Sequence, residues 1–345
     1  MITFLVSDLN RNPLRRLIGR TRGHLPAMQT LTYDRAFRRL QVPGGTLVFT
    51  DFDLLTDFEL DAAGAIAAAA KAAGPVVRIL NTPSAALERA AMLRHLHSRG
   101  LNPVEVTRIE DEKPRRYPVF IRLQGGCERP DTGLLHTEEE YQGALDALRA
   151  EGRSLRGRIA VSYEAAPDAA GHFRKFGAFR VGDHIVPQHI LRGTGWYVKR
   201  SDKTADDAFA EEELAYVRDN PHKDALLKLF DAAGYQYGRA DYTIRNGEVV
   251  LFEINSNPSY PNLTRAWKHR STRHQILMER LDAAFRSIDL AADGRAVPFD
   301  LNLAIGHNVS RRRWNPLVSV LWKRRLTAKS KRAAIGWGER AEAAS

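Results

Sequence analysis

The sequence predicts a mixed α/β fold with a small parallel α/β lobe at its N-terminus. Apolar, β-rich runs predict buried strands at residues 2–6, 45–50 and 76–80. Segments with helical composition at residues 32–40 and 62–73 separate these strands, and such alternation is typical of parallel α/β units. Later in the chain, β-rich runs joined by short turns predict α+β lobes of a different kind.

Length and composition indicate a soluble, globular chain of two or three lobes. The 345 residues are 43% hydrophobic and 27% charged, as is usual for folded domains. No apolar run reaches the length of a membrane span, and the first residues lack the apolar core of a signal peptide. The single cysteine, Cys127, excludes an internal disulfide and is typical of a reducing compartment. The sequence therefore predicts a cytoplasmic protein.

Local signals justify the N-terminal elements. The alanine-rich helix over residues 62–73 ends at a Gly-Pro pair, which stops helices. Asp51 and Asp53 follow the second strand, at the edge where open α/β sheets tend to bind ligands. A turn or a helix cap also explains these two residues, and it is the favoured interpretation. Ser84 is expected to cap a helix over residues 84–99.

The strongest functional pattern is a hairpin over residues 237–258. Two β-rich runs flank Asn246-Gly247, a dipeptide typical of two-residue hairpin turns. Antiparallel pairing across this turn brings Asp241 close to Glu253, and Asn255 leaves the second strand on the same face as Glu253. Mg²⁺ binds such carboxylates together with water and the phosphate oxygens of a substrate.

A pair of acidic residues on a surface hairpin is, in general, more often a solvated face. Glu253, however, follows four apolar residues and is expected at the end of a buried strand. A carboxylate there is costly unless it is paired or bound to a metal. The full pattern R-x-D-x11-E-x-N-x-N-P, from Arg239 to Pro258, therefore favours the metal-site interpretation.

This pattern resembles the metal-binding hairpin of the ATP-grasp superfamily, which includes D-alanine–D-alanine ligase and glutathione synthetase. A looser similarity runs from about Asn81 to about Trp267. The resemblance implies an ATP-grasp fold in three parts. They are an N-terminal α/β lobe over residues 1–83, an ATP-grasp region over residues 84–290 and a basic extension over residues 291–345.

The resemblance also implies roles for the hairpin residues. Asp241, Glu253 and Asn255 would hold two Mg²⁺ ions on the phosphates of ATP, with Mn²⁺ as an alternative metal. Arg239 would be the catalytic residue, contacting the transferred phosphate or the tetrahedral intermediate.

Nucleotide-binding residues are expected upstream of the hairpin. Arg122 ends a strand where the family usually places a phosphate-contacting lysine; the charge is kept, although arginine and lysine are not interchangeable. Gly125 and Gly126 follow in a turn that lets backbone N–H groups approach phosphate, and an ordinary hairpin is the alternative. Glu88-Arg89 stands where the family usually carries Asp-Lys.

Further residues complete the implied nucleotide site. Tyr163 and Glu164 end a strand that resembles the family's hinge strand, whose backbone binds adenine and whose acid binds the ribose. Lys199 is similar in position to a second phosphate-binding lysine, with a solvated surface lysine as the alternative. Other basic residues that could face phosphates or an acidic substrate are Arg174, Lys175 and Arg192.

The implied function is an ATP- and Mg²⁺-dependent ligase that activates a carboxylate as an acyl phosphate and joins it to an amine. Either substrate could be a small molecule or a peptide. Two alternatives stay open: a small-molecule kinase, and a non-catalytic nucleotide-binding protein that uses its basic tail for interactions. Arginine in place of lysine at positions 89 and 122 fits the second alternative, whereas the intact Asp241, Glu253 and Asn255 set argues against it.

The net charge of +11 is unevenly distributed. Residues 295–345 hold eleven Lys/Arg and three Asp/Glu, a net +8, so the rest is nearly neutral and a general nucleic-acid-binding surface is not indicated. Basic clusters at 311–313 and 323–325 flank an apolar stretch that a lipid surface, RNA or an acidic partner could bind. The favoured interpretation is a helix packed on the body with its basic face in water. The sequence leaves oligomerisation open.

Overall fold

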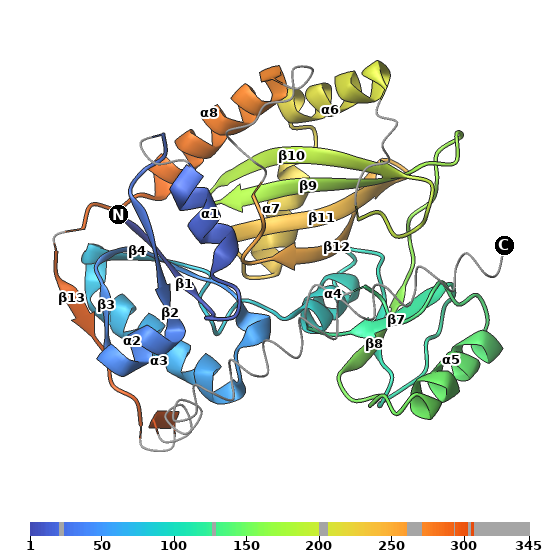
Figure 1. Cartoon of the computed structure of the whole chain (residues 1–345), viewed down its shortest axis with the longest axis horizontal. Helices are drawn as coiled ribbons and strands as arrows, with labels where there is room; N and C mark the ends of the chain where they lie inside the picture. The colour runs from blue at the N-terminus through green and yellow to red at the C-terminus, as the bar shows by residue number, and fades with distance from the viewer. Residues whose placement is uncertain are drawn as a thin grey trace. The chain divides into compact units, whose positions relative to one another are not determined.

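A computed structural model describes residues 1–20, 24–125, 129–199, 206–260, 271–292, 294–302 and 305–306. The chain forms two compact units, Met1–Phe299 and Asp300–Ser345, and all the helices and strands below belong to the first unit (Figure 1). Among the described helices, none is long and apolar enough to cross a membrane. The two basic clusters of the C-terminal extension lie outside the described residues.

The N-terminal lobe is built on a four-stranded sheet. Its elements are β1 (Ile2–Val6), α1 (Asn12–Arg20), β2 (Met28–Thr32), α2 (Tyr33–Arg39), β3 (Gln41–Pro43), β4 (Gly45–Phe49), α3 (Asp57–Ala72) and β5 (Val77–Leu80). The sheet is parallel, in the order β2-β1-β4-β5. Strands β1 and β4 are buried along their whole length, as continuous apolar runs predict. The predicted parallel α/β lobe is therefore confirmed.

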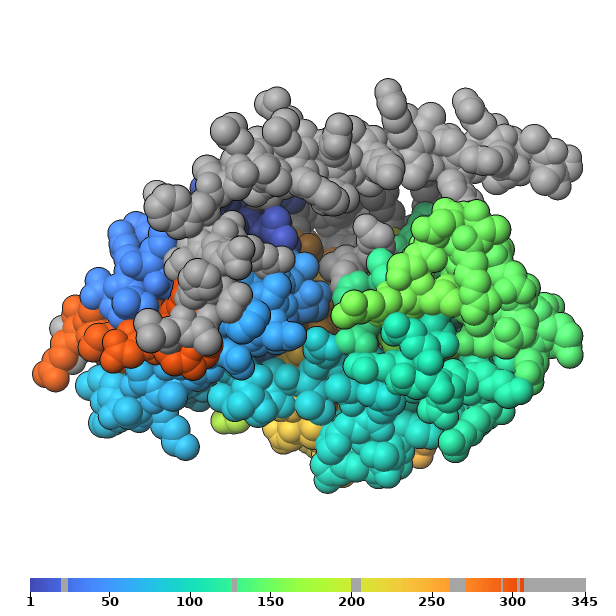
Figure 2. Space-filling view, turned by 90° about the horizontal axis from the view of Figure 1, so that it is seen from below, coloured from blue at the N-terminus to red at the C-terminus, as the bar shows by residue number. Residues whose placement is uncertain are grey.

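A second lobe carries a three-stranded antiparallel sheet in the order β6-β8-β7. Its elements are β6 (Val106–Arg108), β7 (Val119–Leu123), α5 (Glu138–Ala150) and β8 (Arg158–Ser162). Thr137 caps α5 as its side chain accepts from Glu140 N at 3.2 Å. Tyr141 and Leu145 of this helix pack into the apolar core formed with the sheet. In Figures 1 and 2 this green lobe lies beside the blue N-terminal lobe.

Helix α4 (Arg89–Ser98) begins five residues later than the sequence predicts, with Glu88 as its N-cap. Ser84 lies in a turn in which Ala85 N and Ala86 N both donate to Thr82 O, so the predicted Ser84 cap is wrong. Because local hydrogen bonds within this turn replace the first helical turn, the helix starts at Arg89. The helix contacts both β6 and the central sheet.

The central sheet is antiparallel, in the order β10-β9-β11-β12. Its strands and the helices that follow them are β9 (Phe173–Val181), β10 (His184–Gly193), α6 (Asp207–Asp219), α7 (Lys223–Ala232), β11 (Tyr237–Arg245), β12 (Glu248–Asn255) and α8 (Ser271–Ile288). All three helices pack on this sheet (Figure 1). Phe285 and Leu281 of α8 belong to a core shared with Phe4 of β1, so one apolar core joins the N-terminal lobe to the central sheet.

Asn81, the residue after β5, also joins these two sheets. It is fully buried and left-handed, with φ of 58°. Its Nδ2 donates to Phe49 O and Tyr237 O, and its Oδ1 accepts from Gln236 N and Tyr237 N, all within 3.0 Å. A single amide side chain thus satisfies four backbone groups, three of them in buried hydrogen bonds.

The chain returns to the N-terminal lobe after α8. Strand β13 (Ala296–Pro298) pairs with β3, and the Met1 amino group donates to Leu290 O. Residues 291–299, which were expected in the C-terminal extension, therefore belong to the first unit.

Candidate active site

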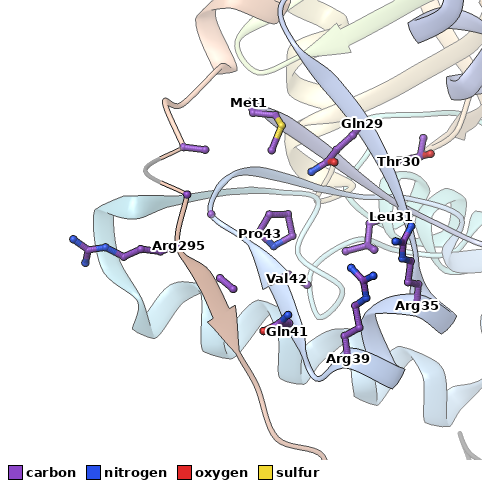
Figure 3. Close-up of a pocket in the computed structure, with 14 residues that line it drawn as sticks. Met1, Gln29, Thr30, Leu31, Arg35, Arg39, Gln41, Val42, Pro43 and Arg295 are labelled. Carbon is purple, nitrogen blue, oxygen red and sulfur yellow. The ribbon is translucent and has the colours of Figure 1, made fainter.

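A cavity of about 850 Å³ collects most of the residues that the sequence analysis singled out. Its lining comes from the segment between β1 and α1, from the three-stranded sheet and from the central sheet, for example through Asn10, Phe120 and Lys175. A second cavity of about 320 Å³ lies at the outer edge of the N-terminal lobe, where Arg35 and Arg39 project side by side from α2 (Figure 3). Both arginines are exposed, and no predicted site residue lines this second cavity.

The β11–β12 hairpin has the geometry that its sequence predicts. Asn246 and Gly247 form the turn with positive φ values of 54° and 82°, as a two-residue turn with φ above zero at both positions requires. Asp241 pairs directly with Glu253, and Arg239 pairs with Asn255. A bulge follows Asp241, and bulges re-aim side chains next to functional sites.

Two cations hold the Asp241 carboxylate. Lys175 Nζ lies 2.8 Å from Oδ2, and Arg239 Nε lies 2.8 Å from Oδ1. Burial raises the pKa of Asp241, but Arg239 and Lys175 together outweigh burial and bring this pKa below its usual value. Asp241 is therefore ionised at neutral pH, as a metal ligand must be.

Two other cations face Glu253. Arg89 Nη2 lies 2.5 Å from Oε2, and Arg122 Nη1 lies 3.9 Å from the same oxygen. Asn255 Nδ2 donates to the other oxygen at 3.4 Å. Burial and the neighbouring Asp241 both raise the pKa of Glu253, whereas Arg89 and Arg122 lower it, and the net shift is downward.

The donor set fits a hard cation that arrives together with phosphate. Asp241 and Glu253 supply carboxylate oxygens, and Asn255 can supply an amide oxygen. In the part of the chain that the structure describes, no group of three or more His, Cys, Asp and Glu side chains could hold a metal ion. A Mg²⁺ ion here would need substrate oxygens to complete its coordination, which suits its preference for carboxylates plus phosphates.

An aromatic cluster lines another part of the same cavity. The Tyr163 hydroxyl donates to Trp196 O at 2.9 Å, and burial raises the pKa of Tyr163. The Trp196 ring lies 5.2 Å from Phe120 and 5.4 Å from Tyr163, centroid to centroid. Together with Val161 and Phe252, these rings form an apolar wall of the kind that binds a planar base.

The structure brings most of the predicted residues together. Those that line the cavity are Arg122, Tyr163, Lys199, Arg239, Asp241, Glu253 and Asn255. Lys199 is exposed at its edge. Glu164 is buried instead, accepts a hydrogen bond from Ser162 and pairs with Arg245, so it is not among the lining residues. Gly125 follows β7 near Asp53 O and is not among them either. Gly126 lies outside the described residues.

Lys175 and Arg89 are site residues to which the sequence analysis assigned no metal-site role. Gly177 of β9 pairs with Asp241, and Lys175 lies two positions earlier on the same face of β9. Its position beside Asp241 therefore depends on sheet register, which no local pattern specifies. In the sequence, Arg89 was noted only because Glu88-Arg89 keeps the positive charge of the Asp-Lys pair that it replaces.

Asp51 supports the N-terminal side of the cavity. It is 2% exposed, has φ of 59°, and accepts from Ser7 N, Asn10 Nδ2 and Asn257 Nδ2 at 2.8–3.0 Å. Asn10 and Asn257 both line the cavity. Asp51 therefore fixes two cavity-lining side chains, a larger role than the turn or cap favoured from the sequence.

The pH dependence of the free energy of unfolding should reveal the protonation of Asp51. Burial raises its pKa to about 6, so between about pH 4 and pH 6 the folded state keeps a proton that the unfolded state has released. As the pH rises from about 4 to about 6, the free energy of unfolding of the wild type should therefore fall by roughly 3 kcal/mol relative to that of Asp51→Asn, in which position 51 cannot titrate. Urea unfolding of both proteins from pH 4 to pH 7 measures this difference. A constant difference would contradict the assignment.

Comparison with known proteins gives matches only among solved structures. No protein-family model matches the chain, and the search of curated proteins gives no match. D-alanine–D-alanine ligase from Bacillus anthracis in complex with ATP is similar at 10% identity, 83% coverage of this chain, 98% of that chain and TM-score 0.43. The ATP-grasp ligase PsnB in complex with a minimal precursor is similar at 12% identity, with 83% of this chain and 98% of that chain covered and a TM-score of 0.48. A RimK domain ATP-grasp protein from Sphaerobacter thermophilus is similar at 11% identity, with 81% of this chain and 98% of that chain covered and a TM-score of 0.44.

Proposed function

We propose that this protein is an ATP- and Mg²⁺-dependent ligase that activates a carboxylate as an acyl phosphate and joins it to an amine. The observation that carries the proposal is the register of the hairpin, which sets Asp241 against Glu253 at a large cavity. Four cations, Lys175, Arg239, Arg89 and Arg122, contact or face these carboxylates. Such a site suits a polyphosphate and its metal ions, in agreement with the ATP-grasp resemblance of the motif.

Different residues of the chain would have different roles in phosphoryl transfer. Arg122 and Lys175 would hold phosphate oxygens in place, and Arg239 would stabilise the charge that develops on the transferred group. The aromatic wall around Tyr163 and Trp196 would hold the base. Asp241, Glu253 and Asn255 would hold Mg²⁺, which when bound neutralises phosphate charge. Attack of an amine on the acyl phosphate would then release phosphate and form the amide.

The reaction can be tested without knowing the amine. The protein would be incubated with Mg·ATP, hydroxylamine and each member of a panel of amino acids, dicarboxylic acids and short peptides. A ligase of this kind should form a hydroxamate, ADP and free phosphate in equal amounts with the correct carboxylate. ADP with a phosphorylated product and no free phosphate would identify a kinase instead. Binding of Mg·ATP without ADP formation for any probe would favour a non-catalytic role.

Arg239→Ala should lower the rate of hydroxamate formation by about 100-fold or more, because loss of one charged donor to a transition state has effects of this size. Arg218→Ala is the matched control, since Arg218 is an exposed arginine of helix α6 that forms an ion pair with its neighbour Asp219. Equal rates of hydroxamate formation in the two variants would show that Arg239 takes no part in the reaction. The variants should be compared at saturating Mg·ATP.

A further inference from the structure

Arg89 connects two parts of the site that are far apart in the sequence. Its Nη2 contacts Glu253 Oε2 at 2.5 Å, and its Nη1 donates to Gln124 O at 3.0 Å. Gln124 follows β7, and its side chain in turn donates to Glu88. One guanidinium group thus links the proposed metal ligand to the turn that follows Arg122.

The backbone that carries Arg89 is well anchored. Arg89 is the first residue of α4, and Leu87 just before it donates from its N–H to Ala233 O. The Tyr235 hydroxyl donates to Leu87 O at 2.9 Å. The Arg89 side chain is only 13% exposed. The guanidinium is therefore held at Glu253 by a fixed support, which distinguishes this contact from a surface ion pair.

We infer that Arg89 is the resident counter-cation of Glu253 and that it keeps divalent metal off this carboxylate until a nucleotide binds. The inference rests on the proposed function, because it takes Glu253 as a metal ligand. The Arg89 guanidinium, 2.5 Å from Glu253 Oε2, repels a metal ion that approaches the same carboxylate, since both are positively charged. Movement of Arg89 onto a phosphate would remove this repulsion and open the carboxylate to the metal ion.

The local charge balance supports this order of events. Arg89, Arg122, Lys175 and Arg239 contribute four positive charges against the two negative charges of Asp241 and Glu253. A free divalent cation is therefore repelled from the site, whereas a triphosphate is attracted to it. Phosphate oxygens would offer Arg89 and Arg122 new acceptors, and Glu253 would then be free for metal.

The test measures two affinities that should change in opposite directions. Binding of Mn²⁺ alone is followed by electron paramagnetic resonance in the absence of nucleotide, and binding of ATP alone is followed by calorimetry in the presence of EDTA. In Arg89→Gln, the Mn²⁺ affinity should rise about tenfold and the metal-free ATP affinity should fall about tenfold, as is typical of coupled sites. A residue that merely supports the fold would weaken both.

Two further variants serve as controls. Arg89→Lys keeps the charge but not the forked contact, so its Mn²⁺ affinity should stay within about threefold of the wild type, well below a typical coupling effect. It should also increase amide hydrogen exchange in residues 119–125, because the contact to Gln124 O is lost. Arg94→Gln, on the exposed face of the same helix, should leave both affinities unchanged.

An unchanged or lower Mn²⁺ affinity in Arg89→Gln would overturn the inference, provided that Mg·ATP stabilises the wild type. Failure of the proposed function gives a different result. In that case the wild type itself shows no stabilisation by Mg·ATP, whatever residue stands at position 89.

Discussion

Replacing Asn81 by alanine should lower the free energy of unfolding by about 4 kcal/mol. The substitution leaves two buried carbonyls, the buried N–H of Tyr237 and the partly buried N–H of Gln236 without the partners that Asn81 supplies. Each unsatisfied buried group costs about 1–3 kcal/mol, although water and small backbone shifts recover part of that. Because these groups belong to both sheets, the loss should loosen the whole first unit. Urea unfolding followed by circular dichroism measures the change.

Asn246→Ala is the matched control for this measurement. Asn246 has almost the same left-handed conformation, with φ of 54° against 58° for Asn81, but it lies in an exposed turn. Its replacement should cost about 1 kcal/mol, because the short polar side chain of asparagine favours the left-handed region through local hydrogen bonds that alanine cannot make. If both variants lost the same stability, the cost would come from backbone conformation, and the proposed junction role of Asn81 would be wrong.

Glu253→Gln should abolish most of the stabilisation that Mg·ATP gives to the protein. At about 100 times its dissociation constant, a ligand adds roughly 2.7 kcal/mol to the free energy of unfolding. If loss of the carboxylate weakens binding about 100-fold, the same concentration adds only about 0.4 kcal/mol. The change keeps the size of the side chain and removes only its charge. Thermal or urea unfolding with and without Mg·ATP gives both values.

Glu248→Gln tests whether the loss is specific to the site. Glu248 begins the same strand and is exposed, so its replacement should leave the Mg·ATP effect intact. The stabilisation of the wild type should also disappear when EDTA removes Mg²⁺. A Glu253→Gln protein that is stabilised as strongly as the wild type would show that Glu253 holds no metal ion.

The sequence by itself determined those features that depend on near neighbours. The Asn246-Gly247 turn and the apolar runs around it define a two-residue hairpin, and a hairpin of known turn length has a known register. Asp241 and Glu253 were therefore predicted to lie close together on paired strands, whereas the bulge after Asp241, which sets the two residues directly opposite each other, was not predicted. The buried strands β1 and β4 are local in the same sense.

Only the tertiary structure decided which cations meet those carboxylates. Lys175 reaches Asp241 because β9 pairs with β11, and Arg89 reaches Glu253 because α4 packs between two sheets. In sequence these partners are 66 and 164 residues apart. Likewise, Asp51 is fixed by Asn257 across 206 residues. Short-range patterns specify the hydrogen bonds within a turn or a strand pair. Contacts between lobes follow instead from burial of apolar surface. Because the hydrophobic effect is non-directional, an apolar segment does not specify which segment it packs against.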